Sequence, residues 1–299
     1  MVDQAQQLRN LVKKSNKVPF KREQFKVNLS RVIAVASGKG GVGKTNFVAN
    51  VGITMSRLGK RVIIVDADLG LANVDLVFGI SSKYHLGHVI SGEKKLSEIV
   101  IDAPEGVKIV AGGAGIAELA NMSDADRVRF IGSLGELEDM ADIILIDTSA
   151  GISNNVLGFV LAADEVVIIT TTEPTAIRDA YGVIKVLARE GREVDMKLVV
   201  NMVDDEEEAE DVANRIKMVV SQFLGSNIEY IGYILRDSSV QRAVLQSEPF
   251  AIAFPKAKAT RCVADIAGKL VHLESEGRAR GKGIKSFLFR LLRLNTRGK

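Results

Sequence analysis

The sequence predicts an α/β domain with a doubly wound, mostly parallel sheet over residues 31–273. Three observations predict this fold. Short apolar runs alternate with longer stretches of helical periodicity, and most of the runs are apolar throughout. Strands of a parallel sheet are covered by helices on both faces, so they lack the polar alternation of a half-exposed sheet. A glycine-rich octet at 38–45 also follows the first apolar run and precedes the first helical stretch.

Each apolar run is expected to form a strand, and each helical stretch a right-handed crossover helix. The expected strands are residues 32–36, 62–65, 107–111, 143–146, 166–170, 198–200 and 228–234. The expected helices are residues 46–58, 124–140, 176–190, 207–224 and 256–273. An acidic run at 204–211 opens one of these helices, where negative charge complements the helix dipole.

The octet GKGGVGKT has the pattern of a nucleotide-binding phosphate loop. Its glycines let backbone N–H groups surround an anion, and the following helix N-terminus adds partial positive charge. We expect Lys44 to reach the β- and γ-phosphates of a nucleotide and Thr45 to bind Mg²⁺ through its hydroxyl. The expected nucleotide contacts are Gly38, Lys39, Gly40, Gly41, Val42, Gly43, Lys44, Thr45 and Asn46.

Two acidic motifs follow later strands, at the edge of the sheet where α/β domains place their ligands. In the first, IIVDAD, Asp66 ends the strand and is expected to support Mg²⁺ or the Thr45 hydroxyl. Asp68 lies beyond it, placed to orient an attacking water. In the second, IILIDTSAG, Asp147 is expected to hold a metal-bound water and Gly151 to face the γ-phosphate.

Composition and charge narrow the class of protein. The chain has 299 residues, 46% of them hydrophobic, and a single cysteine, which excludes a disulfide within one chain. No apolar run reaches the roughly 18–20 residues that span a bilayer, and the N-terminus has no secretory signal, so we expect a cytoplasmic location. Residues 1–31 carry a net charge of +6 and residues 276–299 one of +7, which leaves −10 for the middle of the chain. Basic ends on an acidic domain favour anionic lipids or acidic partners over general nucleic-acid binding.

Five motifs resemble the MinD/ParA family of dimerising ATPases in order and spacing, and within it the flagellar-number regulators of the FlhG type, also called YlxH or FleN. They are GKGGVGKT, VDADLGLANVD (65–75), DTSAG (147–151), TTEPTAIRDAYGVIK (171–185) and VVNMVDD (199–205). The resemblance covers nearly the whole chain. It implies a deviant P-loop ATPase that binds ATP and Mg²⁺ and forms a homodimer when ATP is bound.

The resemblance also implies roles for individual residues. Lys39 would be the signature lysine that reaches the nucleotide of the partner subunit, and Asp68 the residue that activates water. Asp66 and Asp147 would serve magnesium. Asn201 would contact the adenine edge. This chain has Met202 where the MinD pattern has arginine, so one contact to the base differs.

The basic N-terminal extension, residues 1–30, contains the heptad DQAQQLR. The heptad is similar to the DQAxxLR activator motif of the flagellar regulators, which docks on the SRP-type GTPase FlhF and stimulates GTP hydrolysis. On this resemblance Leu8 would anchor a small helix, while Gln4 and Arg9 would complete the partner's active site. The motif residues are Asp3, Gln4, Ala5, Leu8 and Arg9.

The C-terminus consists of a polar linker, residues 274–283, and a basic, apolar segment, residues 284–299. At 100° per residue this segment forms an amphipathic helix, with Ser286, Arg290 and Arg293 opposite its apolar arc. We expect it to bind anionic membrane lipids, and a last core helix is the alternative. The expected membrane residues are Ile284, Lys285, Phe287, Leu288, Arg290, Leu291, Leu292, Arg293 and Leu294.

These features together predict a Mg²⁺-ATP switch that dimerises, attaches reversibly to the inner face of the cell membrane and controls flagellar number or placement. Flagellar switch (C-ring) proteins or flagellar transcription regulators are further expected partners. A MinD-type regulator of the division site is the nearest alternative, and a ParA-type DNA-partitioning ATPase is another. An iron–sulfur carrier of the superfamily would usually carry a CxxC, which the chain lacks. A metabolic kinase would need a second substrate pocket, and the sequence indicates none.

Overall fold

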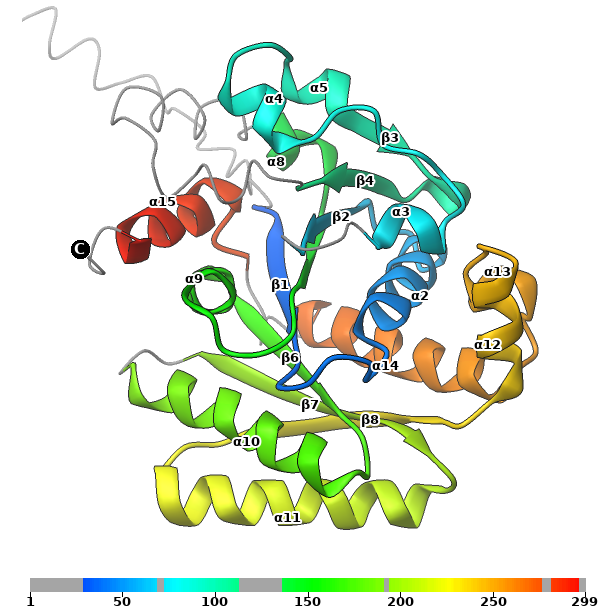
Figure 1. Cartoon of the computed structure of the whole chain (residues 1–299), viewed down its shortest axis with the longest axis vertical. Coiled ribbons are helices and arrows are strands. Elements are labelled where there is room, and N and C mark those ends of the chain that lie inside the picture. The colour runs from blue at the N-terminus through cyan, green and yellow to red at the C-terminus, as the bar shows by residue number, and fades with distance from the viewer. Residues whose placement is uncertain (1–28, 69–72, 113–135, 191–193, 276–280, 296–299) are drawn as a thin grey trace, which may run out of the picture.

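One eight-stranded sheet forms the centre of the computed structural model, which describes residues 29–68, 73–112, 136–190, 194–275 and 281–295 (Figure 1). Within these residues the strand order is β3-β4-β2-β5-β1-β6-β7-β8. All neighbouring strands pair in parallel except β3 and β4. The strands are β1 Arg31–Ala36, β2 Val62–Ala67, β3 Val100–Asp102, β4 Lys108–Ala111, β5 Ile143–Thr148, β6 Glu165–Thr170, β7 Asp195–Val203 and β8 Glu229–Leu235.

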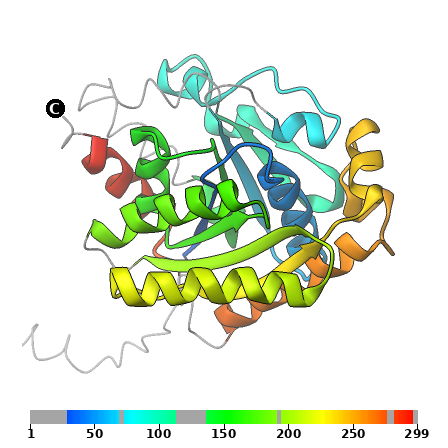
Figure 2. The same ribbon diagram turned by 60° about the horizontal axis from the view of Figure 1, so that its bottom comes forward.

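Helices cover both faces of this sheet, which confirms the doubly wound α/β fold (Figures 1 and 2). The described helices are α2 Lys44–Arg57, α3 Val74–Val77, α4 Leu86–Ile90, α5 Leu96–Ile99, the 3₁₀ turn η1 Pro104–Gly106, α8 Glu136–Met140, α9 Asn154–Ala162, α10 Pro174–Arg189, α11 Glu206–Leu224, α12 Ser238–Leu245, α13 Phe250–Ala253, α14 Lys258–Ser275 and α15 Ile284–Asn295. None of the described helices is long and apolar enough to cross a membrane.

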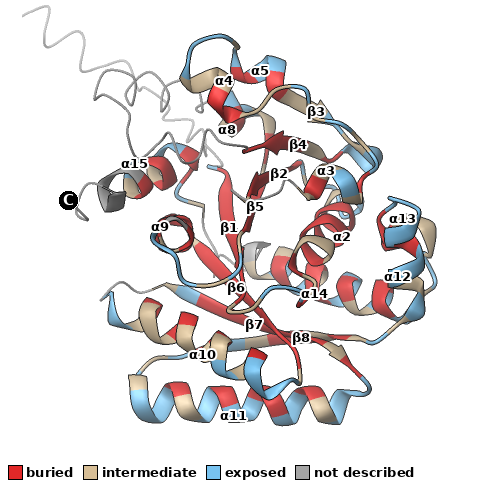
Figure 3. Ribbon diagram, viewed as in Figure 1, coloured by how far each residue is buried: buried red, intermediate tan, exposed pale blue. Residues whose placement is uncertain are grey.

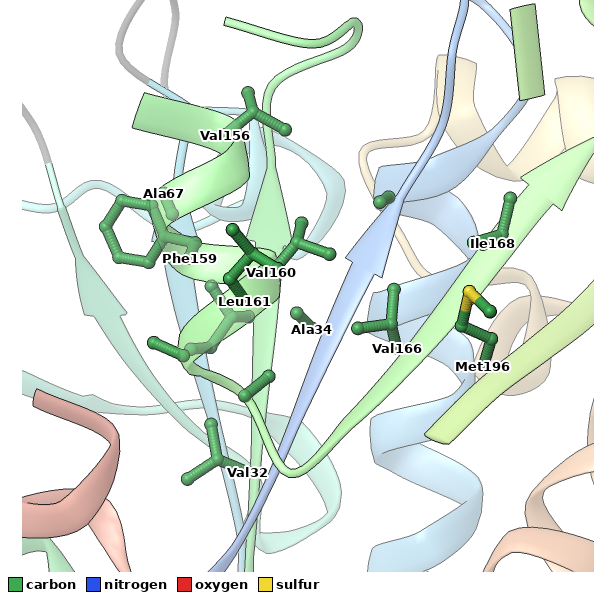
Figure 4. Packing of buried hydrophobic residues seen from close by; sticks show 14 of the residues in the cluster. Val32, Ala34, Ala67, Val156, Phe159, Val160, Leu161, Val166, Ile168 and Met196 are labelled. Atoms are coloured by element: carbon green, nitrogen blue, oxygen red, sulfur yellow. The ribbon is translucent and has the colours of Figure 1, made fainter. Parts of the chain in front are cut away.

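The strands divide the core into two apolar clusters, because successive side chains point to opposite faces. In β1, Val32 and Ala34 belong to the cluster under α9, α10, α11 and α15. Ile33 and Val35 belong to the cluster under α2 and α14. Figure 3 shows that the central strands are buried along their length, and Figure 4 shows α9 packed over β1 with Phe159 and Val160.

All seven expected strands are present, with shifts of a few residues at their ends. The sequence did not predict β3, which is three residues long and pairs antiparallel with β4 at the sheet edge. Four of the five expected helices appear as α2, α10, α11 and α14. The fifth, residues 124–140, falls largely outside the described residues, and its end forms α8. The sequence analysis did not predict the shorter helices α3, α4, α5, α9, α12 and α13.

Local sequence explains where several helices begin. The Ser153 hydroxyl caps α9, and Asp205 caps α11, where three glutamates fill the first turn as the acidic run predicts. By contrast α2 starts directly after Gly43, and no side chain caps it. The first N–H groups of α2 therefore remain available for an anionic ligand.

The C-terminal helix α15 packs onto the domain beside α9 (Figure 1). Gly283, which precedes it, donates its N–H to the Ser30 carbonyl at 3.2 Å. The start of α15 therefore lies next to the point where the N-terminal extension joins β1. Gly283 at the end of the expected linker and helix α15 are thus held to the α/β domain.

Candidate functional site

The phosphate loop joins β1 to α2 and lies where the sheet reverses its order of winding. Gly41 and Gly43 have φ angles of 79° and 87°, a region that favours glycine. Gly38 has a second reason to be glycine, since a Cβ there would lie 2.1 Å from the backbone of Asp179 in α10. The loop therefore needs glycine at these positions for its own conformation and for its packing.

A cavity of about 630 Å³ opens over this loop. That volume is typical of a small-molecule site. It is lined by the loop residues Lys39–Asn46, by Asp68 and Asn73 from the segment after β2, by Ala150, and by Leu76, Val77, Met202, Val244 and Ser247. The cavity is thus bordered by the phosphate loop, by Asp68 of the first predicted acidic motif and by Ala150 of the second.

Lys44 and Asp147 form a buried ion pair at the floor of the site. The Lys44 Nζ lies 3.1 Å from Asp147 Oδ1, and the two side chains are only 9% and 1% exposed. Burial raises the pKa of Asp147, while the charge of Lys44 and a hydrogen bond with Thr45 lower it. The second oxygen, Asp147 Oδ2, is buried, and no group of the residues that the structure describes donates a hydrogen bond to it.

An orphaned carboxylate oxygen in a buried site calls for a partner. A Mg²⁺-bound water would be such a partner, and Thr45 stands beside it with a hydroxyl. Magnesium is usually held by only one or two protein ligands together with phosphate oxygens and waters. The residues present therefore fit a nucleotide-bound magnesium ion.

Asp66 pairs directly opposite Asp147 across β2 and β5, as the alignment of parallel strand ends predicts. Burial raises the pKa of Asp66 to about 6, and the neighbouring Asp147 charge contributes. Its Oδ2 accepts the N–H groups of Asn73 and Val74, at 2.9 and 3.1 Å, and its Oδ1 accepts that of Asp68. Asp66 thus also anchors the segment that carries Asp68.

The two acidic motifs are joined to each other and to the phosphate loop. Ser149 donates its hydroxyl to Asp68 Oδ1 at 2.7 Å. Gly151, with a φ of 95°, donates its N–H to the Ser37 carbonyl at 2.8 Å. The Gly151 N–H thus binds the residue directly before the phosphate loop. Its predicted contact with the γ-phosphate stays a prediction. The sequence analysis also missed Ser149, although it lies within the quoted DTSAG motif.

The sequence is similar to a family model and to proteins of known name. A family model described as an AAA domain matches residues 30–200. The chain is 37% identical over 240 residues to the antiactivator FleN of Pseudomonas aeruginosa, covering 80% of this chain and 86% of that protein. It is 34% identical over 297 residues to the flagellum site-determining protein YlxH of Helicobacter pylori, covering 98% and 99%.

A solved structure of the septum site-determining protein MinD from Pyrococcus horikoshii, complexed with Mg-ADP, has the same fold. Its TM-score is 0.66 at 24% identity, covering 83% of this chain and 98% of that one. The chain belongs to the MinD/ParA family of ATPases.

Lys39, which the sequence analysis predicted to be the signature lysine, contacts groups of its own chain in this structure. Its Nζ forms an ion pair with Glu173 and lies 3.2 Å from the Thr175 hydroxyl, at the start of α10. Both charged side chains are well exposed, at 41% and 62%. The sequence analysis quoted the segment that contains Glu173 and Thr175 but gave neither residue a role.

A second cavity, of about 380 Å³, adjoins the first beside Gly43 and Asn46. Asn201 and Met202 line it, so the structure places the predicted base-binding residue near the loop. The sequence analysis missed the other wall, which comes from the end of β8 and the start of α12. Its residues are Ile234, Leu235, Arg236, Asp237, Val240 and Gln241. The sequence feature that could have indicated this wall is the polar pair Arg236 and Asp237, which directly follows a strand.

The predicted membrane helix turns its apolar face toward the domain in this structure. Ile284, Phe287, Leu288 and Leu291 are each 4% exposed or less, and the Phe287 ring lies 6.2 Å from that of Phe159 in α9. Lys285 is exposed.

Helical periodicity placed Arg290 on the polar side, and in the structure it contacts polar groups at the end of α9. The Arg290 side chain is 20% exposed, and its guanidinium donates to Asp164 Oδ1 at 2.8 Å and to the Ala163 carbonyl at 3.3 Å. Its side chain is long enough to turn back to the end of α9. The side chains of Leu292, Arg293 and Leu294, and the heptad Asp3–Arg9 with Gln4, Ala5 and Leu8, lie outside what the structure describes.

Proposed function

We propose that this protein is an ATP-dependent dimerising switch that hydrolyses ATP slowly and controls the number or placement of flagella. The observation that carries the proposal is the buried Lys44–Asp147 pair, with its orphaned Oδ2, beneath an uncapped helix N-terminus and a glycine-rich loop. The similarity to FleN and YlxH over most of the chain supports the flagellar role. The Mg-ADP complex of the MinD relative supports nucleotide and Mg²⁺ as ligands.

Each residue of the site has a part in this reaction. The loop N–H groups and Lys44 bind the β- and γ-phosphates, and Thr45 and Asp147 are the residues that would hold a magnesium ion. Magnesium, when bound, neutralises charge that develops on the phosphates. Asp68 orients the attacking water, and Ser149 holds the Asp68 carboxylate in place by donating to Oδ1. Gly151 exchanges its bond to Ser37 for one to the γ-phosphate as the site closes.

Dimerisation uses Lys39. In the ATP-bound dimer its ammonium group leaves Glu173 and binds the phosphates of the partner subunit's nucleotide. An exposed ion pair is worth at most about 1 kcal/mol, so triphosphate in the facing site outcompetes Glu173. The exposed apolar side chains of Leu76 and Ile152, near the mouth of the site, are available to the interface.

Membrane attachment depends on α15. Its apolar face can enter a membrane only if it leaves α9, because Phe287 and Leu288 are buried in the present state. ATP-driven dimerisation releases α15, and two helices on one dimer bind anionic lipid with the avidity that a single copy lacks. ATP hydrolysis, for which Asp68 orients the water, reverses these steps and returns α15 to the domain.

The N-terminal heptad acts on the GTPase FlhF, with Leu8 as anchor and Gln4 and Arg9 as the groups offered to its active site. A peptide of residues 1–20 should raise the GTP turnover of FlhF, and the same peptide with Arg9→Ala and Gln4→Ala should not. An inert wild-type peptide would remove the FlhF role. A division-site regulator of the MinD type, the alternative function, would leave flagellar number unchanged when the gene is deleted and would instead misplace septa.

The membrane and nucleotide parts are tested together by vesicle sedimentation. Vesicles of equal parts phosphatidylglycerol and phosphatidylethanolamine should pellet the full chain with Mg-ATP but not with Mg-ADP. Deletion of residues 284–299 should abolish pelleting, and Lys44→Ala should abolish its dependence on ATP. Pelleting that survives the deletion would refute the role of α15.

A further inference from the structure

Asn201 lies at an irregularity in β7. On β7, Asn201 pairs with Ile234 and Val203 pairs with the next residue of β8, so Met202 is an extra residue between them. Met202 has a φ of 60°, which lies in the left-handed region. A bulge of this kind re-aims the side chains beside it.

Both ends of the Asn201 amide are engaged, and one of them contacts the phosphate loop. The Nδ2 donates to the Val42 carbonyl at 2.7 Å, and the Oδ1 accepts the N–H of Met202 at 2.8 Å. This pattern also fixes the orientation of the amide, because a flipped group would set oxygen against carbonyl and NH₂ against N–H. Asn201 is only 7% exposed.

The amide also packs tightly against the loop. A Cβ on Gly43 would lie 2.4 Å from Asn201 Nδ2, and Gly43 already has a φ of 87°. The last glycine before Lys44 is therefore required by its φ and by the approach of Asn201. The Asn201 side chain lies directly against the peptide that links Val42 to Gly43.

The planarity of the Val42–Gly43 peptide explains what the hydrogen bond from Asn201 does. In a trans peptide the C=O of one residue and the N–H of the next point in opposite directions. A loop that binds anions through its N–H groups must turn its carbonyls outward. A carbonyl turned outward into protein needs a donor, which here is Asn201. By holding the Val42 carbonyl, Asn201 fixes the Gly43 N–H on the opposite side of this peptide. Val42, Gly43 and Lys44 all line the cavity.

We propose that Asn201 is a positioning residue, which holds the phosphate loop in its anion-binding conformation and so contributes to the binding of any polyphosphate, with or without a base. This inference rests on the proposed function only in requiring that the loop binds nucleotide. It differs from the role that the family resemblance implies, in which Asn201 contacts adenine and discriminates between bases.

The two roles predict different ligand profiles. Titration calorimetry would compare Mg²⁺ complexes of ATP, GTP and inorganic tripolyphosphate on the wild-type chain, Asn201→Ala and Asn201→Ser. Neither variant side chain reaches the Val42 carbonyl, so all three ligands should bind about tenfold or more weakly, each by the same factor. Asn214→Ala, at an exposed position on α11, is the matched control and should bind as the wild type does.

Circular dichroism melting, run alongside, identifies any variant that fails to fold. If the alanine variant does not fold, the serine variant, which keeps a polar group, provides the test. A loss confined to ATP, with tripolyphosphate affinity unchanged, would overturn the inference and make Asn201 a reader of the base. Unchanged affinity for all three ligands would overturn it as well. A wild-type chain that bound none of them would instead refute the proposed function.

Discussion

The contact between Arg290 and Asp164 offers the sharpest perturbation of the membrane switch. Asp164 is 3% exposed and accepts from the Arg290 guanidinium of α15 at 2.8 Å and from the N–H of Lys282, just before α15, at 3.2 Å. It also accepts the N–H of Val32 in β1 at 3.0 Å. Because Asp164 belongs to the domain and not to α15, changing it loosens the helix without altering the surface that meets lipid. The change we choose is Asp164→Asn, which keeps the shape of the side chain.

The size of the effect follows from the lost charge. A hydrogen bond to a charged group contributes about 1.5–3 kcal/mol, and the asparagine oxygen can still serve one donor, so we take the lower value. About 1.4 kcal/mol changes an equilibrium tenfold. The fraction of chains with α15 undocked, and with it the vesicle partition coefficient without nucleotide, should therefore rise about tenfold.

Vesicle sedimentation of the nucleotide-free protein measures this rise directly. Asp195→Asn is the matched control, because Asp195 lies at the start of β7 and pairs with Lys197. It should pellet as the wild type does. An Asp164→Asn chain that pellets no more than wild type would refute the role of this contact. Equal pelleting after deletion of residues 284–299 would show that the lipid binds elsewhere.

Three further predictions concern the nucleotide site. Lys44→Ala should weaken ATP binding by at least about a hundredfold in calorimetry, because it removes a phosphate ligand and leaves Asp147 buried without its cation. Near-normal affinity would contradict the role of Lys44 as the phosphate-binding lysine. The raised pKa of Asp66, about 6 against 3.8, means that the folded protein binds this proton more tightly than the unfolded chain, so stability falls as pH rises between these values. Urea unfolding without Mg²⁺ should therefore show Asp66→Asn gaining on wild type by up to about 3 kcal/mol from pH 4 to pH 7, and a constant difference would be inconsistent with the shift. Glu173→Gln frees Lys39 from an exposed pair, so ATP-dependent dimers should form a few times more tightly in sedimentation equilibrium, whereas weaker dimers would indicate that Glu173 helps the interface.

The sheet and the floor of the site could be predicted because local patterns determine them. Runs of buried apolar residues identify parallel strands, and carboxyl ends of such strands meet at one edge. Asp66 and Asp147, 81 residues apart in sequence, therefore lie opposite one another as expected. The octet predicted both the position of the phosphate loop and the start of α2.

The features that were missed depend on contacts between distant parts of the chain. An amphipathic helix with basic residues has the same pattern on a membrane and on a protein core. Contacts with distant residues, such as the bond from Arg290 to Asp164, 126 residues away, show that α15 is docked. Arg31 was counted among the basic N-terminal residues, yet it is 1% exposed and paired with Glu165. The hydrogen bond between Asn201 and Val42 likewise spans 159 residues in sequence. It depends on a β-bulge that strand propensity does not reveal.

The most direct test of the switch is the mass of the full chain in solution with each nucleotide. Light scattering during gel filtration should give twice the mass of one chain with a non-hydrolysable ATP analogue and Mg²⁺, and the mass of one chain with ADP. Lys39→Ala should remain a single chain with both. A wild-type protein that kept the mass of one chain with the ATP analogue, or formed the same dimer with ADP, would contradict the account.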